Sequence, residues 1–186
     1  MSMRFSFTLD DEDLKYFQRL LKDARRYASD EDPAAIIGAV RKVVVDARKT
    51  ARLPSFAEEA IDTLEALIDM VEDEDWALPK ASASKVVAAL AYFAHSEDLI
   101  PDHIPGLGFL DDAIMIKIVE TDFKHELWGY RKFSKFRGGA EQRPWTKVAR
   151  ERLPRRLKEK RDQIRDEVSL RREKAQAREG KGLFRW

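Results

Sequence analysis

Apolar residues recur three and four positions apart along most of this chain, and this spacing is the feature that most restricts its fold. Side chains return to the same side of an α-helix about every 3.6 residues, so each such segment carries one apolar stripe. The stripes predict five main helices, over about residues 9–29, 33–49, 55–71, 82–95 and 110–137. The fold class expected is therefore an all-α helical bundle of about five helices, with a charged C-terminal helix.

Local residues add detail to these helices. Thr8, with Asp11 three residues later, predicts a capped start for the first helix, because a side-chain oxygen accepts hydrogen bonds from the free amides there. The segment 82–95 is apolar on almost all sides, which is typical of a buried central helix. Gly138 and Gly139 predict the end of the fifth helix.

Charge is distributed unevenly along the chain, although the formal net charge of the whole is only +1. Residues 1–136 carry 18 Lys and Arg against 26 Asp and Glu, whereas residues 137–186 carry 17 against 8. The first segment thus has a net charge of −8, and the second has a net charge of +9. We expect two parts, an acidic helical bundle over residues 1–137 and a basic, highly charged helical tail over residues 138–186.

The tail offers a surface to an anionic partner. Its apolar seam is thin, and acids alternate with its cations, which weakens the field that a nucleic-acid-binding arm would present. A protein partner or self-association is the first expectation, since the acidic bundle of the same chain or of a second copy complements the tail. Nucleic acid and an anionic membrane surface are the alternatives. The candidate anion-binding residues are Arg150, Arg152, Arg155, Arg156, Lys158, Lys160, Arg161, Arg165, Arg171 and Arg172.

Composition and missing motifs exclude several classes of protein. The chain has no cysteine, which excludes disulfide scaffolds, thiolate metal sites and thiol nucleophiles. No P-loop, nucleophile elbow or glycine-rich dinucleotide fingerprint occurs, so no catalytic residue is predicted and a binding protein is favoured over an enzyme. The longest apolar run, Val86 to Ala94, falls short of the roughly 20 residues that a membrane-spanning helix needs. We expect a cytoplasmic location, with peripheral contact to a membrane as the alternative.

Residues 96–112 form a loop that interrupts the helical pattern yet is rich in Leu and Ile. Its prolines bias the preceding residues to extended conformations, and its aspartates suit turns and the first turn of the following helix. These roles account for the motif residues Asp98, Pro101, Asp102, Pro105, Gly108, Asp111 and Asp112.

This loop, together with Tyr92 and Phe93 in the helix before it, resembles the core of the YkvA-like family, a domain of unknown function found in many bacterial proteins. The similarity extends over about Ser84 to Val119. It implies a unit of helix, hydrophobic loop and helix but no reaction, and some relatives carry it in a membrane-associated context. We therefore expect an uncharacterised, non-enzymatic interaction or scaffold protein that engages a partner through its hydrophobic loop or its basic tail.

The loop aspartates also allow a different hypothesis. Asp98, Asp102, Asp111 and Asp112 supply the oxygen ligands that hard divalent cations prefer, and a divalent-metal-dependent enzyme would follow from such a cluster. The sequence has neither EF-hand spacing nor a zinc signature. No cofactor is therefore predicted, and a divalent cation in the loop is the alternative.

Overall fold

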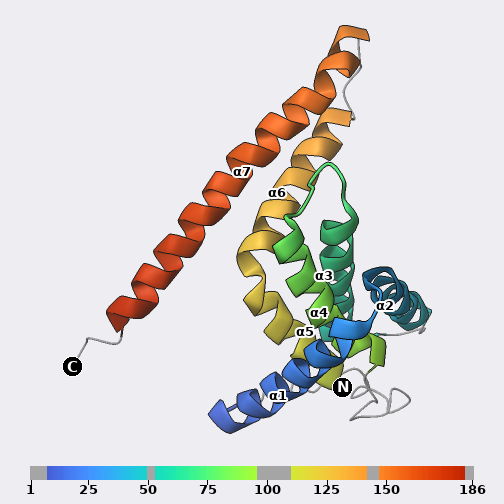
Figure 1. Ribbon diagram of the computed structural model, residues 1–186, viewed down its shortest axis with the longest axis vertical. Helices are drawn as coiled ribbons and strands as arrows, with labels where there is room; N and C mark the ends of the chain where they lie inside the picture. The colour runs from blue at the N-terminus through green and yellow to red at the C-terminus, as the bar shows by residue number, and fades with distance from the viewer. Residues whose placement is uncertain (1–7, 50–52, 96–109, 142–146, 183–186) are drawn as a thin grey trace, which may run out of the picture. The chain divides into compact units, whose positions relative to one another are not determined.

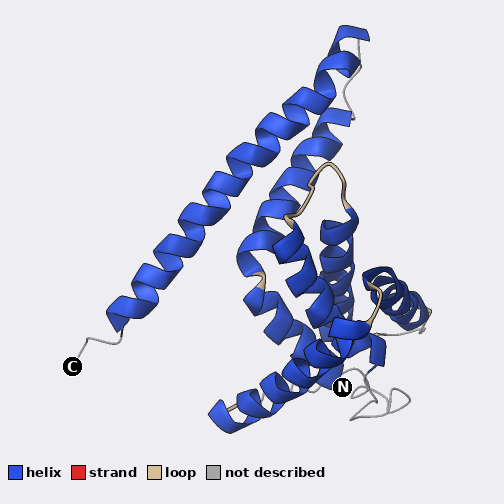
Figure 2. Cartoon of the chain, in the orientation of Figure 1, coloured by secondary structure: helices blue, strands red, loops and turns tan. Residues whose placement is uncertain are grey.

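The computed structural model describes residues 8–49, 53–95, 110–141 and 147–182, and the regular elements in these ranges are all helical (Figure 1). Figure 2 shows the same result as a cartoon without strands in the described chain. The predicted all-α class is thus confirmed for these residues. The helices are α1 (Asp11–Tyr27), α2 (Pro33–Arg48), α3 (Ser55–Glu72), α4 (Lys80–His95), α5 (Leu110–Asp122), α6 (Lys124–Glu141) and α7 (Lys147–Gly182), with a short 3-10 helix at Ala28–Asp30.

The start of α1 differs from the prediction by two residues. Asp10, rather than Thr8, is the capping residue, and its Oδ1 accepts hydrogen bonds from the amides of Glu12 at 2.8 Å and Asp13 at 2.9 Å. The Asp13 carboxylate in turn accepts a hydrogen bond from the Asp10 amide at 3.1 Å. The side chains of Asp10 and Asp13 thus satisfy more of the free amides than a single hydroxyl group does. This explains why the helix is capped by Asp10 and not by Thr8.

The predicted fifth helix is two helices, so the described residues hold seven α-helices where five and a tail helix were expected. Phe123 separates α5 from α6, and its carbonyl accepts the hydrogen bond from the Leu127 amide that opens α6. Gly138 and Gly139 do not end α6, which continues to Glu141. Each glycine costs about 1 kcal/mol relative to alanine in a helix, but Ala140 beyond them is buried, and such packing outweighs propensity.

The chain forms two compact units that are discontinuous in sequence. The first comprises residues 1–65 and 80–119, and the second comprises residues 66–79 and 120–186. In the first unit α4 packs against both α1 and α2, and its residues Val86, Leu90 and Ala91 are fully buried, so the prediction of a central buried helix is confirmed. The division by charge near residue 138 concerns a different property and stays a prediction.

The second unit is built around Trp76, which is 2% exposed. Its ring centroid lies 5.4 Å from that of Phe133 and 6.0 Å from that of Tyr130, both on α6. Within this unit α6 and α7 lie side by side, as Figure 1 shows. Leu157, Ile164 and Val168 of α7 are buried, so the thin apolar seam of the tail is part of the core of the second unit.

Gly129 lies at a close approach of α6 to α7. A Cβ atom added there would lie 2.6 Å from Cγ2 of Val168 and 3.3 Å from Cη2 of Trp76. Valine is branched at Cβ and stiff, so it has little freedom to move away. A hydrogen in place of a side chain is therefore what lets the two helices and the indole ring meet.

Asp73 and Arg137 form a partly buried ion pair in the same unit. Nη1 of Arg137 lies 2.8 Å from Oδ1 of Asp73, and Nη2 lies 2.7 Å from Oδ2, while the Trp76 amide donates to Oδ1 at 2.9 Å. Burial by itself would raise the pKa of Asp73, but the hydrogen bonds from Arg137 and Trp76 outweigh it and hold that pKa below its ordinary value of 3.8. The pair joins the turn after α3 to α6.

We predict that Gly129→Ala lowers the free energy of unfolding by about 1 to 2 kcal/mol, because overpacking against Val168 exceeds the gain in helix propensity. Gly38→Ala is the matched control, since a Cβ at this position in α2 meets nothing within 4 Å. That control should stabilise the protein slightly. Thermal unfolding followed by circular dichroism measures both, and equal effects of the two substitutions would contradict the close approach at Gly129.

We predict that Asp73→Asn lowers stability at neutral pH by about 2 kcal/mol, because the partly buried Arg137 loses its charged partner. The folded-state pKa of Asp73 is depressed, so its stabilisation is complete above the ordinary pKa of 3.8 and is lost as the pH falls through the folded pKa. The stability difference between the native chain and the variant should therefore shrink in acid. A difference that stays constant from neutral to strongly acidic pH would show that the Asp73 charge contributes nothing.

Candidate anion-binding surface

The loop motif falls mainly outside the described residues. Asp98, Pro101, Asp102, Pro105 and Gly108 lie there, and the metal hypothesis for them stays a prediction. Asp111 and Asp112 are described, and both stand in the first turn of α5, where the prediction placed them. Among the described residues no group of three or more metal-binding side chains comes together.

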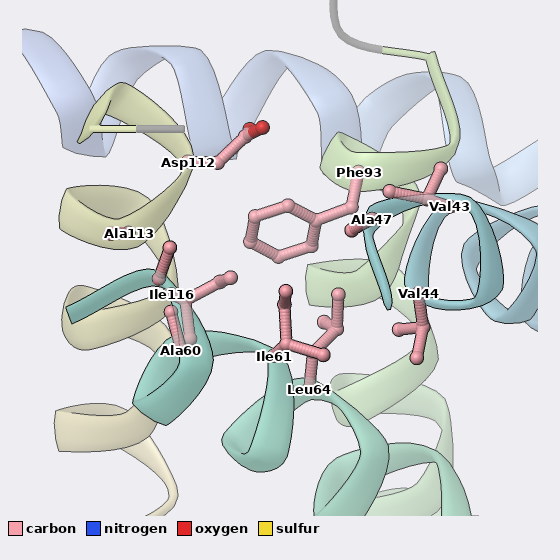
Figure 3. Close-up of a pocket in the computed structure, with 11 residues that line it drawn as sticks. Val43, Val44, Ala47, Ala60, Ile61, Leu64, Phe93, Asp112, Ala113 and Ile116 are labelled. Carbon is pink, nitrogen blue, oxygen red and sulfur yellow. The ribbon is translucent and has the colours of Figure 1, made fainter. Parts of the chain in front are cut away.

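A small apolar pocket of the first unit lies beside the same turn of α5. It is lined by residues of α2, α3, α4 and α5, and Figure 3 shows Phe93 and Ile116 directed into it, with the Asp112 carboxylate at its edge. Its volume of about 30 Å³ is on the scale of a water molecule. A site for a substrate-sized ligand needs about ten times that volume.

Two of the predicted anion-binding residues bind the chain itself. Arg161 donates from Nη1 to the carbonyl of Asp75 at 3.1 Å, and Arg165 donates from Nη2 to the carbonyls of Trp76, at 2.7 Å, and Ala77. Ala77 has a positive φ of 48°, a backbone conformation that costs an alanine free energy. Both arginines therefore bind α7 to the turn at residues 73–77, within the second unit.

Arg165 also covers the indole ring of Trp76, with its guanidinium carbon 5.6 Å from the ring centroid. Burial lowers the pKa of Arg165 from its ordinary value, and the neighbouring Arg161 adds to this effect. Farther along α7, Arg172 forms an ion pair with Glu126 of α6. Arg161, Arg165 and Arg172 thus attach the tail helix to the rest of its unit.

Two further candidates cover aromatic rings of α6. Nζ of Lys160 lies 5.6 Å from the ring centroid of Phe136, and the Arg171 guanidinium lies 4.2 Å from that of Trp128. Lys132 also lies over the Trp128 ring, with its Nζ 5.0 Å from the ring centroid. These cations are in contact with the protein and also reach its surface.

The remaining candidates extend into solvent. Arg152, Arg155, Arg156 and Lys158 are exposed, and Arg155 pairs with Glu159 four residues later at 2.8 Å. Within the described chain, no carboxylate lies at ion-pair distance from the other three. The side chain of Arg150 lies outside the described residues. Exposed cations of this kind are the groups with which an anionic partner exchanges counterions.

Sequence reasoning named the cations of the tail but missed their neighbours on α6. Trp128, Lys132 and Phe136 are spaced four apart, which places them on one side of that helix. This spacing was readable in the sequence, but which part of the tail would lie against it was not. The candidate surface therefore combines exposed cations of α7 with cations and rings of α6.

Comparison with known proteins confirms the resemblance over the segment predicted. Residues 84–118 match a family described as "Protein of unknown function (DUF1232)". The chain is 44% identical over 48 residues to "Uncharacterized membrane protein YkvA" of Bacillus subtilis (strain 168), a match that covers 26% of this chain and 45% of that relative. The chain thus spans less than half of the relative's length. No solved structure matches.

None of the helices in the described chain combines the length and the apolar character needed to cross a bilayer. The relative named above is called a membrane protein in its printed name. These two observations belong to different proteins.

We predict that Arg165→Gln lowers the free energy of unfolding by about 1 to 3 kcal/mol, because two carbonyls and the Trp76 ring lose a charged donor. Arg155→Gln, on the same helix, removes an exposed charge and should leave stability almost unchanged. Chemical denaturation of both variants measures the difference. Similar losses of stability would contradict the division between attaching and exposed cations.

Proposed function

We propose that this chain, whose residues 84–118 form a YkvA-like segment of unknown function, is a non-enzymatic interaction protein that engages an anionic partner through its basic tail helix. The observation that carries the proposal is the presence of Arg152, Arg156 and Lys158 on the solvent-exposed part of α7 without a carboxylate at ion-pair distance among the described residues. Charges that stabilise the fold are paired or buried, whereas these three gain an interaction only when an anion arrives.

An anionic membrane surface is the partner that we favour. The printed name of the Bacillus subtilis relative supports a membrane setting, and the helices of the described chain are unsuited to spanning a bilayer. Peripheral attachment through cations reconciles the two observations, because Lys and Arg near an anionic bilayer each strengthen binding about fivefold.

An acidic protein surface is the second partner class, and the charge of the chain itself favours it. Residues 1–136 carry a net charge of −8, so the tail of one copy complements the N-terminal part of another. Sedimentation of the full chain at low and high salt tests this form of the proposal. Self-association that disappears with added salt supports it, and a monomer at all salt concentrations contradicts it.

We predict that the full chain binds vesicles containing phosphatidylserine at low salt, and that binding weakens steeply as salt is added. The triple variant Arg152→Gln, Arg156→Gln, Lys158→Gln should bind roughly 100-fold more weakly, at about fivefold for each cation. Substitutions are preferable to deletion of the tail, because Leu157, Ile164 and Val168 are buried and deletion would expose their partners.

The control variant Lys15→Gln, Lys22→Gln, Lys42→Gln changes the net charge equally with substitutions of exposed residues in α1 and α2. It should bind almost as well as the native chain. Short single-stranded RNA and duplex DNA are tested as parallel probes. Failure of the chain to bind any anionic probe, or equal weakening by both triple variants, would sink the proposal.

A further inference from the structure

One side of α7 is basic along most of the helix, and we call it the basic edge. Apart from the adjacent Leu170 and Arg171, its residues follow one another at spacings of three and four, which places them on one side of a helix. Contacts with α6 locate this side: Lys160 lies over Phe136, and Arg171 lies over Trp128. The members of the basic edge on α7 are Arg152, Arg156, Lys160, Gln163, Glu167, Leu170, Arg171, Lys174 and Arg178.

The acids of α7 are concentrated on a different side. Glu167 is the single carboxylate among the members of the basic edge, and it forms an ion pair with Lys132 of α6. Five other acids are exposed on the side of α7 that faces away from its buried residues: Glu151, Glu159, Asp162, Asp166 and Glu173. Charges that alternate in the sequence are thus separated in space, and the basic edge presents a nearly unmixed positive field.

Aromatic rings of α6 border the basic edge, and their faces are covered by cations. Arg171 lies 4.2 Å and Lys132 5.0 Å from the ring centroid of Trp128, and Lys160 lies 5.6 Å from that of Phe136. Single-stranded nucleic acids are bound by stacking bases on open aromatic faces. Here a cation already lies over each ring, so base stacking on that face would first have to displace it, whereas anionic headgroups need only reach the cations.

An exposed leucine stands among these cations. Leu170 is 53% exposed, the largest exposed fraction of any large hydrophobic residue in the described chain. A polar partner would gain no binding free energy from contact with this side chain. An exposed leucine and a partly exposed tryptophan surrounded by Lys and Arg match the boundary between headgroups and acyl chains of a bilayer.

We infer that the basic edge of α7, together with Trp128 and Lys132 of α6, is a contact surface for an anionic lipid bilayer, with Leu170 and Trp128 at the level of the headgroups. The inference rests on the proposed function and adds to it which side of the tail makes contact and which chemistry it meets. Cations bind the phosphate and carboxylate groups of the lipids, and the two apolar side chains leave water at the interface.

The test compares two double variants of the full chain with the same change in charge. Arg156→Gln with Lys174→Gln removes two exposed cations of the basic edge. Arg155→Gln with Lys42→Gln removes one exposed cation from another side of α7 and one from α2. The probes are vesicles of phosphatidylcholine with phosphatidylserine, vesicles of phosphatidylcholine alone, and single-stranded RNA. Binding is measured by cosedimentation and fluorescence anisotropy, and circular dichroism verifies that the variants are folded.

We expect binding to the phosphatidylserine vesicles, little binding to phosphatidylcholine alone, and a loss of roughly 25-fold in the partition coefficient for the basic-edge variant, at about fivefold for each cation. The other double variant should lose at most a few-fold. Leu170→Ser should weaken vesicle binding several-fold without changing its dependence on salt, because it removes apolar contact and no charge.

Each contrary result has a distinct meaning. Equal losses for the two double variants would overturn the assignment to the basic edge. Salt-dependent binding to RNA without binding to anionic vesicles would overturn the lipid inference and leave the proposed function standing. Absence of binding to every anionic probe would overturn both.

Discussion

Burial of Trp76 is the constraint on which the second unit depends. The indole packs against Tyr130 and Phe133 of α6 and is covered by the Arg165 guanidinium from α7. Close packing around so large a ring requires a residue without a side chain at the crossing of α6 and α7, and Gly129 meets that requirement. The turn at residues 73–77, held by Asp73 and Arg137, therefore sets where α7 can lie against α6.

The position of α7 also decides what its many cations do. Arg161, Arg165 and Arg172 bind carbonyls or a carboxylate of their own unit. Lys160 and Arg171 lie over rings at the border of the basic edge, and Arg152 and Arg156 extend into solvent. A helix that reads as a mixture of charges thus has one side for attachment, one basic side and one side where acids are common. The candidate function follows from this separation, because a surface attracts an anion only where like charges are neighbours.

Helix type and helix starts were largely predictable, since both depend on residues close together in the chain. Apolar spacing indicated the helical segments before the tail, and the burial of α4 followed from its apolar character on all sides. The break at Phe123 was not predictable, because the apolar pattern continues through it. Gly138 and Gly139 led to a wrong prediction of the helix end for a related reason. The low helix propensity of glycine was outweighed by the packing of the buried Ala140. The candidate site was predicted only in part, as cations of the tail without the rings of α6.

The sequence by itself determined an all-helical chain, the opposite charges of its two parts and a YkvA-like segment near its middle, because periodicity, composition and a local motif can be read residue by residue. It also determined which residues of α7 share a side, since helical geometry requires no partner. Only the tertiary structure decided which of those sides is covered. That choice depends on contacts such as those of Val168 with Gly129 and of Arg165 with Trp76, which join residues far apart in the sequence and contribute their free energy only when the unit is packed.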